Sequence, residues 1–209
     1  MPFLPKYDTL TKSENKYYHK ENYIMRKNFG AKTAVYPMPV FIIAAYDENG
    51  VANAMNAAWG GISEEKEVSI CISEDHKTTY NILHSKAFTV SMATADYVKE
   101  CDYLGLVSGN KIPNKLEICG FHTAKSQFVN APIIQELPMA VECELLSYDP
   151  ESCRLIGRIV NISMDESVLT EDKVDLTKLR PICYDSFNHD YHVIGAKVGN
   201  AFADGKALF

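Results

Sequence analysis

The sequence lacks the features that mark several common classes of protein. It has no CxxC pair and no cysteine spacing typical of a zinc site. No apolar run approaches the ~20 residues of a membrane helix, and the first residues hold no apolar core of a secretory signal. We therefore expect no metal site, no membrane association and a cytoplasmic location. Reduced thiols are then expected at all six cysteines, which are Cys71, Cys101, Cys119, Cys143, Cys153 and Cys183.

Motifs of the common nucleotide-binding and hydrolytic folds are missing as well. The patterns GxGxxG, GxxxxGK[ST] and GxSxG do not occur, and the stretch from Gly105 to Lys111 has the wrong spacing for a phosphate loop. His189 and His192 form an HxxH pair without the carboxylate of a metalloprotease, and such histidines are commonly structural or solvated. We expect no catalytic cluster among the protein's own side chains.

The composition is that of a globular protein with an atypical first segment. The 209 residues are 46% hydrophobic and 23% charged, which suits one domain with its own core. The net charge of -6 argues against a nucleic-acid partner. Residues 1–33 carry six lysines and one arginine against three acidic residues. We predict an N-terminal arm or extension over 1–33, either packed on a partner subunit or solvated, and one domain over 34–209.

Alternating apolar residues predict mainly strands over the rest of the chain. The run "VFIIAAYDENG" ends in Asn49-Gly50, a hairpin signal because both residue types tolerate positive φ. Further strands are predicted in "KEVSICI", "AFTVSMA", "MAVECELLSYD" and "CRLIGRIVNISMD". Short helices are predicted in "DHKTTYNILHSK" and "ATADYVKECDYLGL". Hairpins outnumber helices, so an antiparallel barrel with a few small helices is the expected fold.

The strand "GVANAMNAAWGG" has an unusual composition for a core strand. In one regular strand Asn53, Met55, Ala57 and Trp59 would share a face. Alanines such as Ala58 let a flat ligand approach the backbone, and the amides of Asn53 and Asn56 both donate and accept hydrogen bonds. Two interpretations remain open: a platform for a planar ring, or a crowded barrel strand that needs small residues.

A possible phosphate site follows in "HKTTYNI". It places Lys77, Thr78 and Thr79 at the start of a predicted helix, where unpaired N–H groups, two hydroxyls and one cation favour an anion. The alternative is an ordinary capped helix. Together, a ring-binding strand and a phosphate-binding helix start indicate a mononucleotide with a flat ring, a description that riboflavin phosphate (FMN) meets.

The order of several segments resembles the flavin reductase-like FMN-binding split-barrel family, and within it the flavoredoxins. These segments are "PMPVFIIAAYDENGVANAMNAAWGGIS", "HKTTYNI", "AFTVSMA", "GNKIPNK", "APIIQELPMAVECEL", "IGRIV" and "YHVIGAKVGNAFADGK". The likeness spans Pro37 to Lys206. It implies a mainly β, antiparallel Greek-key split barrel that forms a homodimer, with FMN bound non-covalently near the subunit interface.

The resemblance also implies a set of cofactor-binding residues and a chemistry. The flavin would carry the redox reaction, with NAD(P)H or a redox protein as donor and flavin, ferric iron or a protein as acceptor. An FMN-binding electron carrier without NAD(P)H activity is the alternative. Arg154 stands where relatives often have a histidine, which leaves its flavin contact open. The expected cofactor-binding residues are Asn53, Met55, Asn56, Ala57, Ala58, Trp59, Lys77, Thr78, Thr79, Lys115 and Phe187.

Overall fold

A computed structural model describes residues 26–209 of the chain. Contacts within the chain separate Met1–Lys32 from a unit formed by Thr33–Phe209, and the latter unit holds all described helices and strands. Most of the predicted arm over 1–33 lies outside the described residues. No helix within residues 26–209 is long and apolar enough to cross a membrane.

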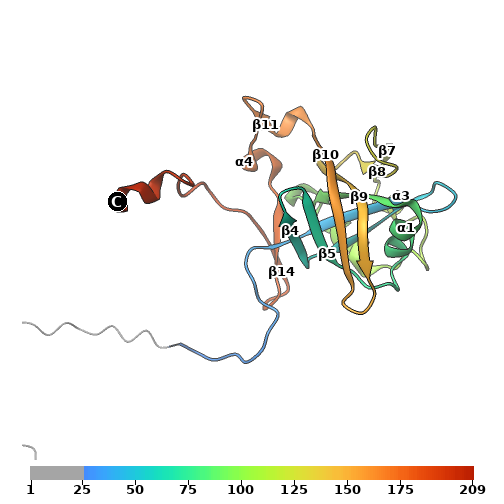
Figure 1. The fold of residues 1–209 in the computed structure, drawn as a ribbon, viewed down its shortest axis with the longest axis horizontal. Helices are drawn as coiled ribbons and strands as arrows, with labels where there is room; N and C mark the ends of the chain where they lie inside the picture. Colours follow the sequence, from blue (N-terminus) through green and yellow to red (C-terminus); the bar gives the residue numbers. More distant parts are fainter. Residues whose placement is uncertain (1–25) are drawn as a thin grey trace, which may run out of the picture. The chain divides into compact units, whose positions relative to one another are not determined.

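Seven antiparallel strands form the main sheet, which curls into a split barrel (Figure 1). The mainly β, split-barrel fold expected from the sequence is confirmed. The predicted strand segments match β2 (Phe41–Tyr46), β6 (Ala87–Met92), β9 (Met139–Asp149) and β10 (Arg154–Met164), on which successive side chains point to opposite faces of the sheet. Across the sheet the order is β3 (Ala52–Ala57), β2 (Phe41–Tyr46), β6 (Ala87–Met92), β9 (Met139–Asp149), β10 (Arg154–Met164), β5 (Glu67–Cys71) and β4 (Gly60–Glu64).

Shorter strands make three small sheets beside the main one. β1 (Met38–Pro39) pairs with β13 (Ile182–Asp185), which pairs with β14 (Asp190–Val193). The other two sheets are the pairs β7 (Thr123–Lys125) with β8 (Pro132–Ile134), and β11 (Leu169–Thr170) with β12 (Lys173–Val174). The β13–β14 hairpin brings the end of the domain beside residues that precede β2.

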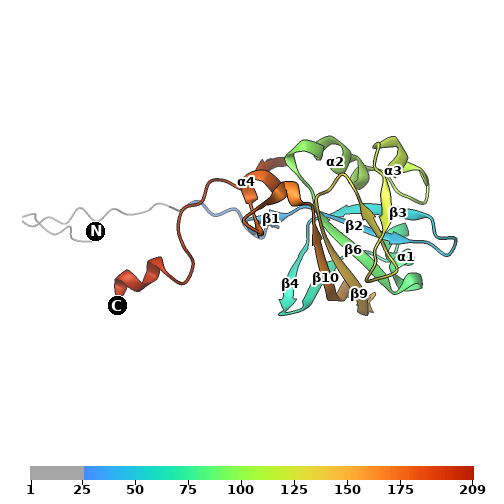
Figure 2. The ribbon, with the colours of Figure 1, turned by 90° about the horizontal axis from the view of Figure 1, so that it is seen from above.

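Four short α-helices accompany the sheet: α1 (Lys77–Ser85), α2 (Val98–Leu106), α3 (Lys115–Ile118) and α4 (Leu176–Leu179). Three 3₁₀ turns, Ala95–Tyr97, Glu166–Val168 and Asp204–Leu208, complete the elements. α1 follows an extended His76 and ends at Lys86 in the left-handed conformation (φ 60°). In Figure 2, α2 and α3 cover one side of β2 and β3.

Alternation along β2 divides the core into two layers. Phe41 and Ile43 belong to the inner cluster, inside the curled sheet, with residues of β5, β6, β9 and β10. Ile42 and Ala44 face the other way and pack with α2 and α3. β3 is divided in the same manner, since Met55 joins the inner cluster and Ala54 the outer one. Asn53 and Asn56 thus lie on opposite faces of one edge strand.

The prediction of one continuous strand through Trp59 is wrong. β3 ends at Ala57 and β4 begins at Gly60, and these two strands lie at opposite edges of the sheet. Trp59 lies in the connection, and its carbonyl accepts from the N–H of Cys71 at 2.8 Å. Gly60 is required there because a Cβ would lie 2.7 Å from the carbonyl oxygen of Ser69. The connection therefore bridges the split of the barrel.

The hairpin predicted at Asn49-Gly50 is confirmed with a different turn. β2 and β3 pair as expected, but among these two residues only Gly50 has a positive φ (76°). The Asp47 carboxylate accepts from the N–H groups of Asn49 and Val51, both at 2.9 Å. The side chain of Asp47 therefore stabilises a longer loop than the two-residue turn that the dipeptide suggests.

Candidate functional site

The start of α1 and the edge strand β3 enclose a cavity of about 270 Å³, called here the α1 cavity. Six of the predicted site residues line it, from three separate parts of the sequence: Asn53, Met55, Asn56, Lys77, Thr78 and Lys115. The remaining lining residues are His76 and the segment from Leu104 to Gly109, at the end of α2 and in the loop after it.

Asn53 carries a buried polar atom that lacks a partner. Its side chain is 5% exposed, and its Nδ2 donates to Thr78 Oγ1 at 2.6 Å. Its Oδ1 has no hydrogen-bond partner among the described residues. Gly109 lies against this amide, since a Cβ there would be 2.2 Å from Oδ1. A buried carbonyl oxygen left unpaired costs about 1–3 kcal/mol, so a donor on a ligand would satisfy a group that the protein leaves open.

Lys115 is a buried cation in the wall of the same cavity. It is 2% exposed, and its Nζ donates to the carbonyl oxygens of Leu104 and Val107, both at 3.1 Å. Burial lowers the pKa of Lys115 to about 8. The ammonium group has three donors, and the two carbonyls use two of them. An anion or an acceptor in the cavity would stabilise the charged form.

The first turn of α1 adds further positive potential. No side-chain hydrogen bond caps the helix at His76, so the first N–H groups stay available to an anion. Lys77 Nζ lies 3.8 Å from Asp47 Oδ2 and 5.1 Å from the centre of the Tyr80 ring. Thr79 is differently placed: its hydroxyl donates to the Ser73 carbonyl at 2.7 Å, and the residue does not line the cavity.

A second cavity of about 450 Å³ adjoins the first and is called here the hairpin cavity. The two share Asn56, Gly105 and Leu106. Its other lining residues come from the position before β2, from the end of β3 and the residue after it, from α2 and from the β13–β14 hairpin: Val40, Ala57, Ala58, Asp102, Tyr184, His189 and Tyr191. The predicted residues Ala57 and Ala58 thus lie next to the α1 cavity but outside it.

Hydrogen bonds fix the polar groups of the hairpin cavity. Tyr191 donates from its hydroxyl to Asp102 Oδ1 at 2.7 Å, and burial together with this bond raises the pKa of Tyr191. Asn56 Nδ2 donates to the carbonyl of Cys101 at 3.2 Å. Tyr184 Oη lies 2.8 Å from His189 Nδ1. Within residues 26–209 no group of three or more His, Cys, Asp or Glu side chains is placed to hold a metal ion.

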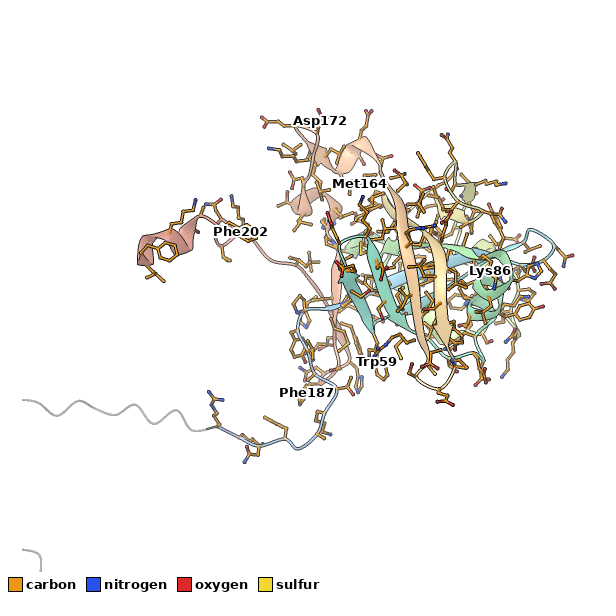
Figure 3. The ribbon with its side chains drawn as sticks, in the orientation of Figure 1. Trp59, Lys86, Met164, Asp172, Phe187 and Phe202 are labelled. Atoms are coloured by element: carbon orange, nitrogen blue, oxygen red, sulfur yellow. The ribbon has the colours of Figure 1, made fainter. Side chains whose placement is uncertain are left out.

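Four residues considered at the sequence level line neither cavity: Thr79, described above, Trp59, Phe187 and Arg154. Trp59 is 56% exposed in the β3–β4 connection. Phe187 lies in the β13–β14 turn. Figure 3 shows Trp59 and Phe187 at the lower end of the unit. Arg154 is exposed at the start of β10, opposite Cys71. The structure does not bring these residues to the cavity walls.

Several lining residues escaped the sequence-level interpretation. Asp102, Tyr184 and Tyr191 meet only because the hairpin folds back on α2, and no local motif marks this. Gly105 and Gly109 stood in the stretch rejected as a phosphate loop on its spacing. Their lack of a side chain was the available signal of close packing, because a Cβ on Gly105 would lie 3.1 Å from Asn56 Cβ. His76 directly precedes the predicted helix start.

The fold and these cavities define a class of protein. Residues 33–186 match the model of the flavin reductase like domain, and the chain belongs to that family. It is similar to the flavoredoxin of Desulfovibrio vulgaris (Miyazaki F), with 32% identity, a TM-score of 0.83, and coverage of 87% of this chain and 100% of that one. A flavoredoxin from Methanosarcina acetivorans is similar at 25% identity and a TM-score of 0.80, covering 88% and 100%.

Two other matches are more distant. Nitrilotriacetate monooxygenase component B from Bacillus cereus is 19% identical with a TM-score of 0.69, covering 80% of this chain and 89% of that one, which shows a common fold. A curated relative from Aeropyrum pernix, an uncharacterised protein, is 25% identical over 113 residues. The alignment spans 54% of this chain but only 43% of that relative.

Proposed function

We propose that the protein binds FMN non-covalently across the two adjoining cavities. The phosphate would be held in the α1 cavity by the N–H groups that begin α1 and by Lys77, with Thr78 beside them. The isoalloxazine would lie toward Ala57 and Ala58, where small side chains admit a ring. The observation that carries this proposal is the junction of a cationic, donor-rich cavity with an aromatic one at Asn56.

The residues present suit this cofactor. The unpaired Oδ1 of Asn53 would accept a hydrogen bond from a ribityl hydroxyl or from a ring N–H. The buried ammonium of Lys115 would gain a negatively charged partner. When bound, the flavin would supply the redox chemistry. The chain would bind and orient it, with Leu104 and Val107 in the wall of the α1 cavity. No acid or base from the protein is required for hydride transfer to a flavin.

The activity we propose is electron transfer of the flavin reductase or flavoredoxin type. NAD(P)H or a redox protein would be the donor, and a flavin, ferric iron or a protein the acceptor. Similarity to two proteins named flavoredoxin supports this direction. Their name also supports the alternative, an FMN-binding carrier without NAD(P)H activity. Rapid anaerobic bleaching of bound FMN by NADH or NADPH would establish the enzyme, and reduction only through a partner protein would establish the carrier.

We further propose a homodimer. Trp59, Phe187 and Arg154 line neither cavity, so as site residues they would act at the ring's outer edge or at the subunit boundary. This assignment is separate from the phosphate assignment. A monomer by light scattering that still binds FMN would refute the dimer and leave the cofactor proposal standing.

The phosphate assignment has a direct test in a comparison of FMN with riboflavin, which lacks the phosphate. Lys77→Ala, alone and with Thr79→Ala, is expected to weaken FMN about tenfold more than riboflavin, the loss of roughly one charge-assisted contact. Flavin fluorescence quenching measures both affinities. Lys99→Ala, which removes an exposed lysine of α2, is the matched control. Equal losses for the two ligands would contradict the assignment, and a wild-type protein that quenches neither would refute flavin binding.

A further inference from the structure

The segment after β14 exposes apolar side chains that its own chain does not cover. Val198, Phe202, Leu208 and Phe209 are 101%, 97%, 90% and 106% exposed. Figure 3 labels Phe202 on this segment. Single exposed apolar residues are common, but Ile194 is exposed as well, and five such side chains within residues 194–209 are a concentration of the kind that marks an interaction site. This segment is named the C-terminal arm.

The arm contains a specified turn that fixes the place of Phe202. The Asp204 carboxylate accepts from the backbone N–H of Asn200 at 2.8 Å and from its Nδ2 at 3.3 Å. Phe202 lies inside this turn at a φ of 59°, a conformation that is unfavourable for an aromatic residue. The turn thus holds the Phe202 ring in solvent at a cost in backbone strain. Contact of this ring with another protein surface would offset that cost.

An apolar face without a complete cover exists on the same chain, on the inner face of the main sheet. Ile62 of β4 pairs with Val68, and Ile162 of β10 pairs with Val141. Paired residues share a face of the sheet, and Val68 and Val141 are buried in the inner cluster. Ile62 and Ile162 therefore lie on the inner face, yet they are 71% and 45% exposed.

This face extends the inner core into solvent. Met139 packs against the inner cluster and pairs with Met164, and Met92 and Ile159 pack against the same cluster. Methionine side chains adapt to the shape of an incoming group. The open mouth, as we name this face, consists of Ile62, Met92, Met139, Ile159, Ile162 and Met164.

We propose that the C-terminal arm of one copy packs into the open mouth of a second copy, with Phe202 as its anchor. The charges agree, because the arm carries Lys197 and Lys206 against Asp204, while Glu64, Glu65 and Glu67 outnumber Lys66 at the β4–β5 hairpin that holds Ile62. In one chain both surfaces stay exposed, and a reciprocal exchange between two copies forms two equivalent arm–mouth contacts related by twofold symmetry. The proposal rests on the homodimer proposed above and is independent of FMN.

The first test measures the dimer dissociation constant by sedimentation of the full chain. Phe202→Ser and Ile62→Ser are each expected to raise it at least about tenfold, because each removes an apolar side chain buried in the exchange. Phe128→Ser is the matched control, since Phe128 is 57% exposed in the β7–β8 loop outside both surfaces. Unchanged association of both variants, or an equal effect of the control, would overturn the proposal.

The second test identifies the contact and the copy that supplies it. Phe202→p-benzoylphenylalanine is introduced into ¹⁵N-labelled chains, which are mixed with unlabelled wild-type chains and irradiated. Cross-linked peptides should join the labelled arm to unlabelled peptides of β4, β6, β9 or β10, the strands that carry the open mouth. Links only within labelled chains, or links to strands other than these four, would overturn the exchange. FMN titration of Phe202→Ser separates the proposals, since intact flavin binding with lost association leaves the cofactor assignment unaffected.

Discussion

Gly109 has a role that depends on its lack of a side chain. A Cβ at this position would lie 2.2 Å from Asn53 Oδ1, closer than non-bonded atoms approach. Gly109→Ala should therefore displace the loop or the amide, lowering stability by about 1–3 kcal/mol and weakening FMN. Urea unfolding and fluorescence quenching measure the two effects. Gly61→Ala, where a Cβ meets nothing within 4 Å, is the control and should change neither. Wild-type behaviour of Gly109→Ala would mean that the loop does not close on Asn53.

Lys115 predicts a pH dependence of cofactor affinity. Burial lowers the pKa of Lys115 to about 8 in the folded protein, whereas the pKa of an unfolded lysine is about 10.4. Between these values the unfolded state binds more protons, and the stability of the ligand-free protein rises with pH. FMN affinity should move oppositely, falling by up to about tenfold per pH unit above pH 8 as the ammonium loses its charge.

The control for this pH effect is Lys115→Met, which keeps the length of the side chain and removes the charge. It should bind FMN more weakly at pH 7 and show a flatter profile between pH 8 and 10. A profile as steep as that of the wild type would assign the dependence to another group. Stability measured without flavin over the same range gives an independent check, since its rise with pH should disappear in Lys115→Met.

At the scale of elements, the turn of the β13–β14 hairpin is organised by one carboxylate. Asp185 accepts from the Tyr36 hydroxyl at 2.5 Å, from the Phe187 N–H at 2.9 Å and from Asn188 Nδ2 at 2.7 Å. These bonds hold the pKa of Asp185 well below its usual range. A depressed carboxylate pKa stabilises the fold fully above the unfolded pKa of about 3.9, and this contribution is lost progressively as the pH falls below that value toward the lower pKa of the folded state.

Asp185→Ala should accordingly loosen this turn without unfolding the domain. Hydrogen exchange at residues 185–190 should be faster in Asp185→Ala than in the wild type at pH 7. This difference between the two proteins should shrink as the pH falls below about 4, because the wild type then loses the same contribution. Asp190→Ala, on the same hairpin, is the control. Unchanged exchange in Asp185→Ala would show that strand pairing alone holds the turn. The effect on melting should be small because Asp185 is only half-buried, at the end of β13.

The elements were predictable to the extent that their pattern is local. β9 and β10 alternate over 11 residues each, and α1 has a clear start and end. The break at Ala58–Trp59 was missed because alternation continues through it. Only the pairing of β4 with β5, at the far edge of the sheet, shows that the strand must end. Local sequence does not determine which edge of the sheet a strand joins.

For the whole unit, the same limit applies to the site. Residue types at Asn53 and Lys77 indicated a ligand, but their meeting with Lys115 depends on the packing of α2 and α3 against β3. The aromatic wall of the hairpin cavity depends on the end of the domain folding back beside β2. The chemistry of individual residues was thus predictable, while the enclosure that combines them was set by the topology.

That enclosure predicts where FMN should alter the dynamics of the whole unit. The two cavities are lined by β3, the start of α1, the end of α2 and the β13–β14 hairpin, four segments far apart in the sequence. A ligand that spans both cavities must slow hydrogen exchange in all four segments together, because each opening would break its contacts. At 100 times its dissociation constant FMN should add about 2.7 kcal/mol to the free energy of unfolding. Riboflavin at the same multiple of its dissociation constant should protect the hairpin but leave the start of α1 less protected.

The β7–β8 pair, which lines neither cavity, is the internal control for this prediction. Protection confined to the hairpin with FMN as well would contradict a phosphate at α1, and protection of β7–β8 alone would place the ligand elsewhere.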